Sequence, residues 1–131
     1  MLNAFLRRDF AQVAQDFEVV ALDSEGLTVR LPVAERHLRP GNTVSGPTMF
    51  ALADVTMYLA ILSRIGPVAL AVTTNCSIDF LRKPEARRDL IARARVLKIG
   101  RRLAVGDVLI HSEGVDDPVA RAGLTYAIPP R

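Results

Sequence analysis

The chain has 131 residues, half of them hydrophobic and 24% charged, with a formal net charge of +3. This length is typical of a single domain with a core of its own, and the balance of residues excludes a disordered segment. One cysteine, Cys76, excludes an intramolecular disulfide and favours a reducing, cytoplasmic location, and together with two histidines it is too little for a structural zinc site.

The first third of the chain predicts a helix followed by two strands. Apolar residues recur at three- and four-residue steps over residues 3–16, which is the spacing of an amphipathic helix. Two short strands are expected over residues 17–21 and 27–33, on either side of a four-residue turn at 23–26. Residues 35–45 include a proline and a glycine and are expected to form a loop.

A long apolar stretch in the middle of the chain predicts a helix that is buried on most sides. Ser45 is a suitable N-cap, and Pro47 follows at a position where its missing N–H does no harm. Residues 48–65 are mostly good helix formers with apolar side chains nearly all around, and residues 66–67, Gly-Pro, are expected to end the helix. No membrane is expected, because Asp54 interrupts a stretch that is already shorter than the about 20 apolar residues of a span.

The rest of the chain is predicted to form strands. Residues 68–81 are rich in β-branched side chains, and alternation would put these residues on one face: Leu70, Val72, Thr74, Cys76, Ile78 and Phe80. Three more strands are expected over residues 89–99, 103–111 and 119–128. Their short connections indicate antiparallel neighbours, so the sequence predicts an α+β fold with an antiparallel sheet wrapped around one long central helix.

Asp54 is the residue that most needs an explanation, because it lies in the middle of the most apolar helix. Burying an unpaired carboxylate is costly, and natural cores rarely keep one. Two interpretations stay open from the sequence. Either Asp54 faces a polar gap and satisfies a loop through hydrogen bonds, or it is a reactive carboxylate.

Gly46 opens the same helix, where a free N–H would lie at the positive end of the helix dipole. Such an N–H can polarise a carbonyl group or stabilise an oxyanion, and glycine has no side chain to block a ligand. Gly46 and Asp54 are separated by about 12 Å along a helix. If both act on one bond, they must therefore come from two copies of the chain in a symmetric dimer.

The segment Arg39 to Pro47, followed by Ala51 to Asp54, resembles the loop and helix of the hotdog-fold thioesterases, in particular the phenylacetate-pathway (PaaI-like) acyl-CoA thioesterases. Further similarities lie at residues 78–84, 100–102 and 122–126, and the order of elements matches the hotdog fold over nearly the whole chain. The resemblance implies hydrolysis of an acyl-CoA thioester to a free acid and coenzyme A. It also implies a homodimer with sites at its interface, commonly paired into a homotetramer.

The resemblance also implies roles for individual residues. Asp54 would be the general base or nucleophile, and Gly46 would polarise the carbonyl group through its N–H. A hydroxyl on the long strand, from the partner's side of the site, would orient water; Thr73 is the best match and Thr74 the alternative. Basic residues are expected to meet the phosphates of coenzyme A, namely Arg82, Lys83, Arg101 and Arg102. Neither a metal nor a cofactor is implied, since coenzyme A is part of the substrate.

The loop departs from the family pattern in two places. The family usually has Asn where this chain has Arg39, and His-Gly-Gly where it has Ser45, Gly46 and Pro47. The usual histidine and asparagine shape the site around the glycine and the water, so their replacement leaves the rate and the substrate open. Arg39 could instead bind a carboxylate or phosphate of the substrate. Asn42 and Ser45 are further candidate substrate-binding residues of this loop.

Two other functions stay open: an acyl-CoA hydratase or dehydratase, and a non-catalytic acyl-CoA binding module. The same fold hosts lyase chemistry, but those relatives generally pair histidine with an acid, and neither His37 nor His111 is placed beside Asp54 by its spacing. Both histidines are expected on the surface or in loops, and Cys76 is expected to be a small buried hydrophobe. Nucleic-acid binding is not expected, because the charges are mixed and aromatic side chains are few.

Overall fold

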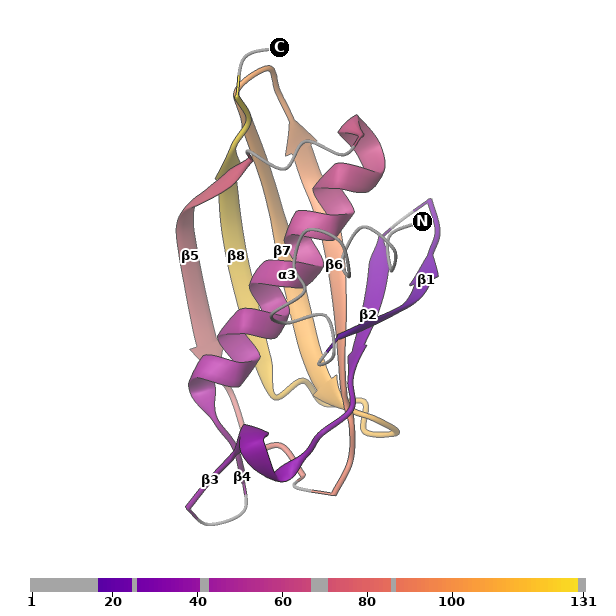
Figure 1. Cartoon of the computed structure of the whole chain (residues 1–131), viewed down its shortest axis with the longest axis vertical. Coiled ribbons are helices and arrows are strands. Elements are labelled where there is room, and N and C mark those ends of the chain that lie inside the picture. The colour runs from indigo at the N-terminus through magenta and orange to yellow at the C-terminus, as the bar shows by residue number, and fades with distance from the viewer. Residues whose placement is uncertain (1–16, 25, 41–42, 67–70, 86, 130–131) are drawn as a thin grey trace.

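In the computed structural model, one long helix lies across one face of a six-stranded antiparallel sheet (Figure 1). The structure describes residues 17–24, 26–40, 43–66, 71–85 and 87–129. The helix is α3 (Gly46–Ile65), and the sheet order is β1-β2-β6-β7-β8-β5. The strands are β1 (Glu18–Leu22), β2 (Leu27–Leu31), β5 (Val72–Phe80), β6 (Leu90–Ile99), β7 (Leu103–Ser112) and β8 (Ala120–Ala127). The predicted α+β architecture is confirmed, while the helix predicted over residues 3–16 lies outside the described residues.

Local capping sets both ends of α3. Ser45 has an extended backbone (φ −70°, ψ 151°), and its hydroxyl accepts a hydrogen bond from the Thr48 N–H at 3.3 Å. At the other end, the Gly66 N–H donates to the Leu62 carbonyl at 2.9 Å, and Gly66 takes a φ of +90° that favours glycine. The helix therefore begins and ends where the sequence predicts.

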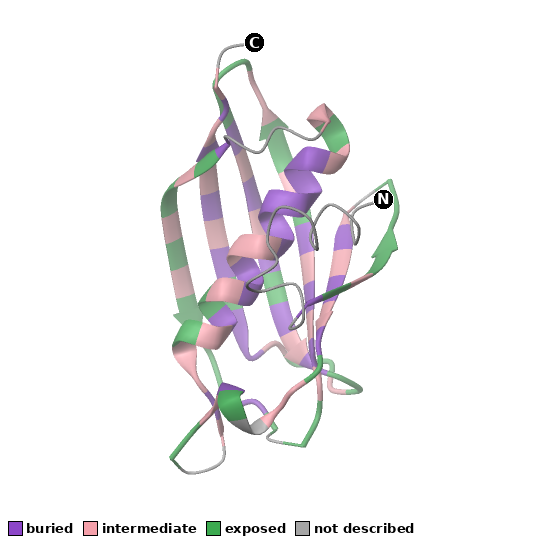
Figure 2. Ribbon diagram, viewed as in Figure 1, coloured by how far each residue is buried: buried purple, intermediate pink, exposed green. Residues whose placement is uncertain are grey.

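The core lies between α3 and the sheet, and burial alternates along β6, β7 and β8 (Figure 2). Small residues of the sheet lie beneath the helix, among them Ala92, Ala94 and Gly106. A side chain on Gly106 would collide with Met57 of α3 and with the Arg95 carbonyl of β6. By length and composition α3 could cross a membrane, but 56% of that stretch is buried in the fold, as in a core helix.

Strand β5 contains a bulge that the sequence does not reveal. Its register against β8 shifts between Thr73 and Asn75. Thr73 lies opposite Tyr126, and Cys76 lies opposite Leu124. Because both partners on β8 are buried beneath the helix, Thr73 and Cys76 face the helix side of the sheet although they are three residues apart.

The bulge corrects the predicted face of this strand. Cys76 and Ile78 do share the helix side, as predicted. Val72 and Thr74 do not, because the extra residue at the bulge turns them away, and both are exposed. Leu70 lies outside the described residues.

The predicted loop before α3 contains regular structure. A 3-10 turn, η1 (Glu35–His37), leads into a short antiparallel hairpin of β3 (Leu38–Arg39) and β4 (Thr43–Val44). The Ser45 N–H donates to the His37 carbonyl at 2.9 Å, which ties this segment to the start of α3. The hairpin thus fixes the approach to the N-terminal end of the helix.

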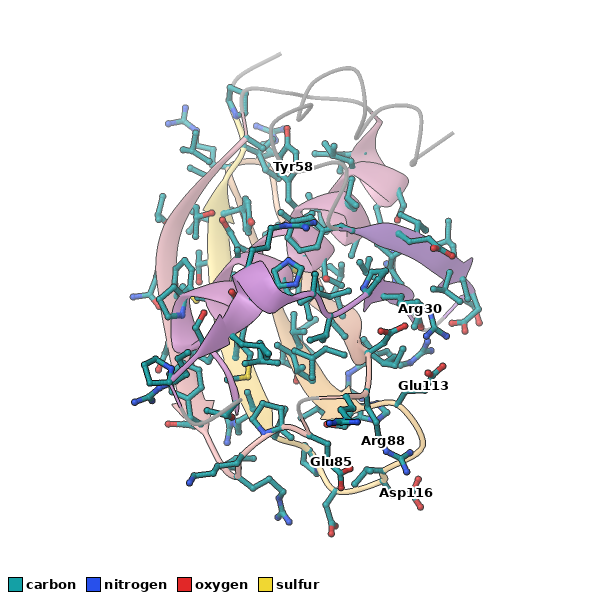
Figure 3. The ribbon with its side chains drawn as sticks, turned by 60° about the horizontal axis from the view of Figure 1, so that its bottom comes forward. Arg30, Tyr58, Glu85, Arg88, Glu113 and Asp116 are labelled. Atoms are coloured by element: carbon teal, nitrogen blue, oxygen red, sulfur yellow. The ribbon has the colours of Figure 1, made fainter. Side chains whose placement is uncertain are left out.

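Ion pairs join the strands at one end of the sheet (Figure 3). Arg30 of β2 contacts Asp89 at 2.9 Å and Glu113 at 2.6 Å. The hydrogen bond from Arg30 lowers the pKa of the Glu113 carboxyl below its ordinary value. These contacts link β2 to the segments flanking β6 and β7, and they lie outside the cavities described next.

Candidate active site

Asp54 borders a cavity of about 310 Å³ formed by α3, β5 and β8. Most of the lining is apolar or aromatic, with Val55, Ala71 and Val72 beside the rings of Tyr58 and Tyr126. The two rings stack with centroids 5.9 Å apart and planes inclined by 25°. The carboxylate therefore lies at the edge of a largely apolar hollow.

One oxygen of the Asp54 carboxylate accepts two hydrogen bonds. The Thr73 hydroxyl donates to Oδ1 at 2.7 Å, and the Tyr126 hydroxyl donates to the same Oδ1. The Tyr126 oxygen also lies 2.7 Å from the carbonyl oxygen of Asp54. No donor to Oδ2 is found among the described residues. Asp54 is thus held by strands β5 and β8 rather than satisfying a loop, and its second oxygen is open as far as the described residues are concerned.

Tyr126 is a site residue that the sequence analysis missed. It is 2% exposed, and burial, followed by the charge of Asp54 and its hydrogen bond, raises the pKa of the phenol well above its ordinary value. Burial and the charge of Asp54 also raise the pKa of the Cys76 thiol. A usable signal was present: alternation along β8 places Tyr126 on the buried face, where its hydroxyl needs a partner.

A second cavity, of about 540 Å³, lies at the N-terminal end of α3. Gly46 lines it, and the Gly46 N–H has no acceptor among the described residues. The ring of Phe80 lies against Gly46, because a Cβ built there would be 3.3 Å from Phe80 Cζ. An unpaired N–H at a helix start can polarise a ligand carbonyl, as the sequence predicts.

The basic residues predicted to meet phosphates fall into two groups. Arg39, Arg82 and Lys83 line the cavity beside Gly46. Arg101 and Arg102 line a cavity of about 690 Å³ with Arg64, at the C-terminal end of α3. In one chain the two groups are separated by the length of the helix, about 30 Å for 20 residues.

The remaining candidates are placed as follows. Ser45 caps α3, and the Thr74 hydroxyl donates to the Thr125 carbonyl at 3.3 Å instead of reaching Asp54. Asn42 lies outside the described residues. Within the described part of the chain, no three Asp, Glu, His or Cys side chains gather as a metal site would require.

Neither histidine lines the cavity of Asp54. His37 lies in the connecting segment before α3, as one of the two predicted alternatives has it, but its side chain is buried and its Nδ1 accepts a hydrogen bond from the Ala34 N–H at 2.9 Å. His111 is partly buried, with Nδ1 3.1 Å from the Val115 carbonyl oxygen. Among the described residues of one chain, neither histidine is therefore paired with Asp54.

The cavities of Gly46 and Asp54 have no lining residue in common. Since the two groups also lie eight positions apart on one rigid helix, a single copy does not bring them to the same reacting atom. One chain therefore presents the Gly46 N–H and the Asp54 carboxylate in two separate cavities.

Comparisons with known proteins agree with the fold. A model of the thioesterase superfamily matches residues 41–119, which include Gly46, Asp54 and Thr73. A solved candidate thioesterase from Silicibacter sp. TM1040 is 58% identical, with a TM-score of 0.92 over 98% of this chain and 90% of that one. The superposition confirms the expected hotdog fold.

Relatives at lower identity are thioesterases as well. The acyl-coenzyme A thioesterase PaaI of Escherichia coli K12 is 29% identical over 111 residues, which cover 85% of this chain and 77% of that protein. The solved E. coli PaaI structure gives a TM-score of 0.79 at 27% identity, over 95% of this chain and 94% of that one. The chain therefore belongs to the thioesterase superfamily and is a thioester hydrolase.

Proposed function

We propose that this enzyme hydrolyses acyl-CoA thioesters at sites formed between two copies of the chain. The Gly46 N–H of one copy draws electron density from the thioester carbonyl. Asp54 of the facing copy either activates a water molecule or attacks the carbonyl carbon to give an anhydride that water then opens. The products are a free acid and coenzyme A, and neither route calls on a metal or cofactor.

The observation that carries this proposal is the environment of Asp54. Its carboxylate is anchored at Oδ1, and Oδ2 meets no donor from the part of the chain that the structure describes, at the edge of an apolar hollow. A carboxylate with one oxygen open to such a hollow can take a proton from water or reach a carbonyl carbon. The acyl-CoA class of substrate is supported by the E. coli relative, which is named as an acyl-coenzyme A thioesterase.

The edge of the sheet supports a dimer. β5 is the last strand of the sheet order, and it exposes apolar Val72 and Phe80, which are 56% and 53% accessible. An unpaired apolar edge is prone to pair with another chain. We propose that β5 pairs with β5 of a second copy about a two-fold axis.

Such a pairing would also unite the two basic groups. α3 begins near the end of β5 and runs across the sheet in the opposite sense to that strand (Figure 1), so a two-fold axis at β5 puts the N-terminal end of one α3 at the same end of the dimer as the C-terminal end of the other. Arg82 and Lys83 of one copy would then border the same groove as Arg101 and Arg102 of its partner. A groove with cations from both copies suits the phosphates of coenzyme A.

The face of the sheet away from α3 supports a further association. Leu97, Leu103 and Leu109 are half exposed there, at 56%, 51% and 51%. We propose that this face joins two dimers into a tetramer, because exposed leucines on one sheet surface mark an interaction site.

The proposal is tested by Asp54→Asn, which keeps the shape of the side chain and removes its basicity. We expect the variant to release no measurable free thiol from a panel of short, medium and aromatic acyl-CoA esters, while gel filtration still shows the wild-type oligomer. Asp116→Asn is the matched control, since Asp116 is exposed and lies at the other end of the view from Tyr58 (Figure 3). Undiminished turnover by Asp54→Asn would exclude the assigned role.

A further inference from the structure

Three elements far apart in the sequence meet at one carboxylate oxygen. α3 supplies Asp54, β5 supplies Thr73 and β8 supplies Tyr126. The bulge in β5 places Thr73 opposite Tyr126 with both side chains on the helix side. This arrangement is fixed by the register of two strands and is not a chance contact between exposed side chains.

The number of protons on Asp54, Thr73 and Tyr126 determines which group donates each hydrogen bond among them. The Thr73 and Tyr126 hydroxyls each carry one proton, and an ionised carboxylate can only accept. Both donors are directed to Oδ1, while Oδ2 has no donor among the described residues. The Tyr126 hydroxyl also donates to the Asp54 carbonyl oxygen at 2.7 Å, so its one proton is shared between Oδ1 and the helix backbone, which fixes the phenol against α3.

We infer that Tyr126 is a positioning residue of the thioesterase reaction, which with Thr73 anchors Oδ1 of Asp54 and leaves Oδ2 as the oxygen that meets water or the acyl carbon. Tyr126 acts through Asp54 and does not itself touch the reacting atoms. A carboxylate fixed at one oxygen has lost its rotational freedom before the substrate arrives, which lowers the entropic part of the barrier.

The phenol is suited to this task over the whole working pH range. It is buried, and its pKa is raised first by burial and then by the charge of Asp54. It therefore keeps its proton and remains a donor to the carboxylate. A lysine or histidine at this position would instead bring a charge or titrate near neutral pH.

The inference rests on the proposed function and is tested with Tyr126→Phe, which keeps the ring and removes only the hydroxyl. We expect kcat to fall by at least about tenfold, because the Asp54 carboxylate can rotate once the phenol no longer holds Oδ1. KM should stay within about twofold of the wild-type value, because substrate binding is left intact. The acid limb of the kcat/KM profile should move to higher pH, because a carboxylate that loses a donor takes up a proton more readily. Thr56→Val is the matched control, since it removes a buried hydroxyl that bonds only the Leu52 carbonyl, at 2.6 Å.

A second measurement does not depend on how the phenylalanine variant folds. The chain has two tyrosines, so tyrosinate absorbance can be followed against pH in the wild type and in Asp54→Asn. We expect one tyrosine to ionise at a lower pH in Asp54→Asn, because the neighbouring negative charge is gone. Identical titrations in the two proteins would show that the phenol and the carboxylate do not interact.

The outcomes separate the inference from the proposed function. If Asp54→Asn remains active, the proposed function fails. If Asp54→Asn is inactive while Tyr126→Phe has the wild-type kcat and an unmoved acid limb, the positioning role of Tyr126 is overturned and the proposed function stands.

Discussion

Two substitutions at Gly46 separate its N–H from the space that its missing side chain leaves. Ser45 has ψ 151°, a conformation that also suits a residue before proline, so Gly46→Pro fits the first position of the helix. Gly46→Ala adds the same Cβ, 3.3 Å from Phe80 Cζ, but keeps the N–H. We expect kcat to fall about a hundred- to a thousandfold in Gly46→Pro, because the oxyanion donor is lost.

Gly46→Ala should retain most of the wild-type kcat, as measured by thiol release under saturating substrate. Equal loss in the two variants would mean that the space at Gly46 matters and its N–H does not.

Tyr126 should also make the folded enzyme lose stability at alkaline pH. Its pKa lies above the ordinary value of 10.0 in the folded state and near that value in the unfolded chain. The unfolded state therefore releases this proton first, and stability that is full below about pH 10 declines as the pH rises further. Comparing the free energy of unfolding at about pH 8 and about pH 11, at fixed protein concentration, should show a smaller decline in Tyr126→Phe than in the wild type. An equal decline would show that the phenol does not contribute.

The residues of the site differ in how visible they are in the sequence. Gly46 and Asp54 stand out because a glycine at a helix start and a lone acid in an apolar helix are local features. Tyr126 was missed because its contact with Asp54 spans 72 positions and depends on the packing of β8 beneath α3. Thr73 was identified through the family resemblance, and the structure adds that its hydroxyl donates to Asp54 Oδ1.

Among the elements, β7 must accommodate the helix that crosses it. A Cβ at Gly106 would collide with Met57 and with the Arg95 carbonyl, whereas a Cβ at Gly123 on β8 meets nothing within 4 Å. Gly106→Ala should therefore lower the free energy of unfolding by about 1–3 kcal/mol through overpacking. Gly123→Ala is the matched control, and denaturant unfolding should show little change or a small gain. Equal stability of the two variants would mean that α3 packs less closely on β7 than described.

The elements themselves follow closely from local sequence. The caps at Ser45 and Gly66 set the ends of α3, and alternation along β6 separates its buried alanines from its outward arginines. Alternation gave the wrong face on β5, where the strand bulges between Thr73 and Asn75. A bulge is set by the register against β8, which the strand's own residues do not encode, so the sides of Val72 and Thr74 were predicted wrongly.

For the whole molecule, the proposed reaction requires an assembly of two copies. Within one chain the Gly46 amide and the Asp54 carboxylate line cavities that have no lining residue in common. The helix geometry predicted this separation from the sequence, because an α-helix has a fixed rise per residue. The proposed pairing of two copies uses the exposed edge of β5, which becomes evident only once the strand order is known.

The most direct test of the shared site is to mix two inactive variants, Gly46→Pro and Asp54→Asn, by unfolding them together and refolding. Random pairing makes half of the dimers mixed, and each mixed dimer holds one site with both groups intact, so about a quarter of the wild-type activity should return. Each variant refolded alone should stay inactive. If the mixture is as inactive as its parts while gel filtration shows that mixed oligomers have formed, Gly46 and Asp54 do not act together across an interface.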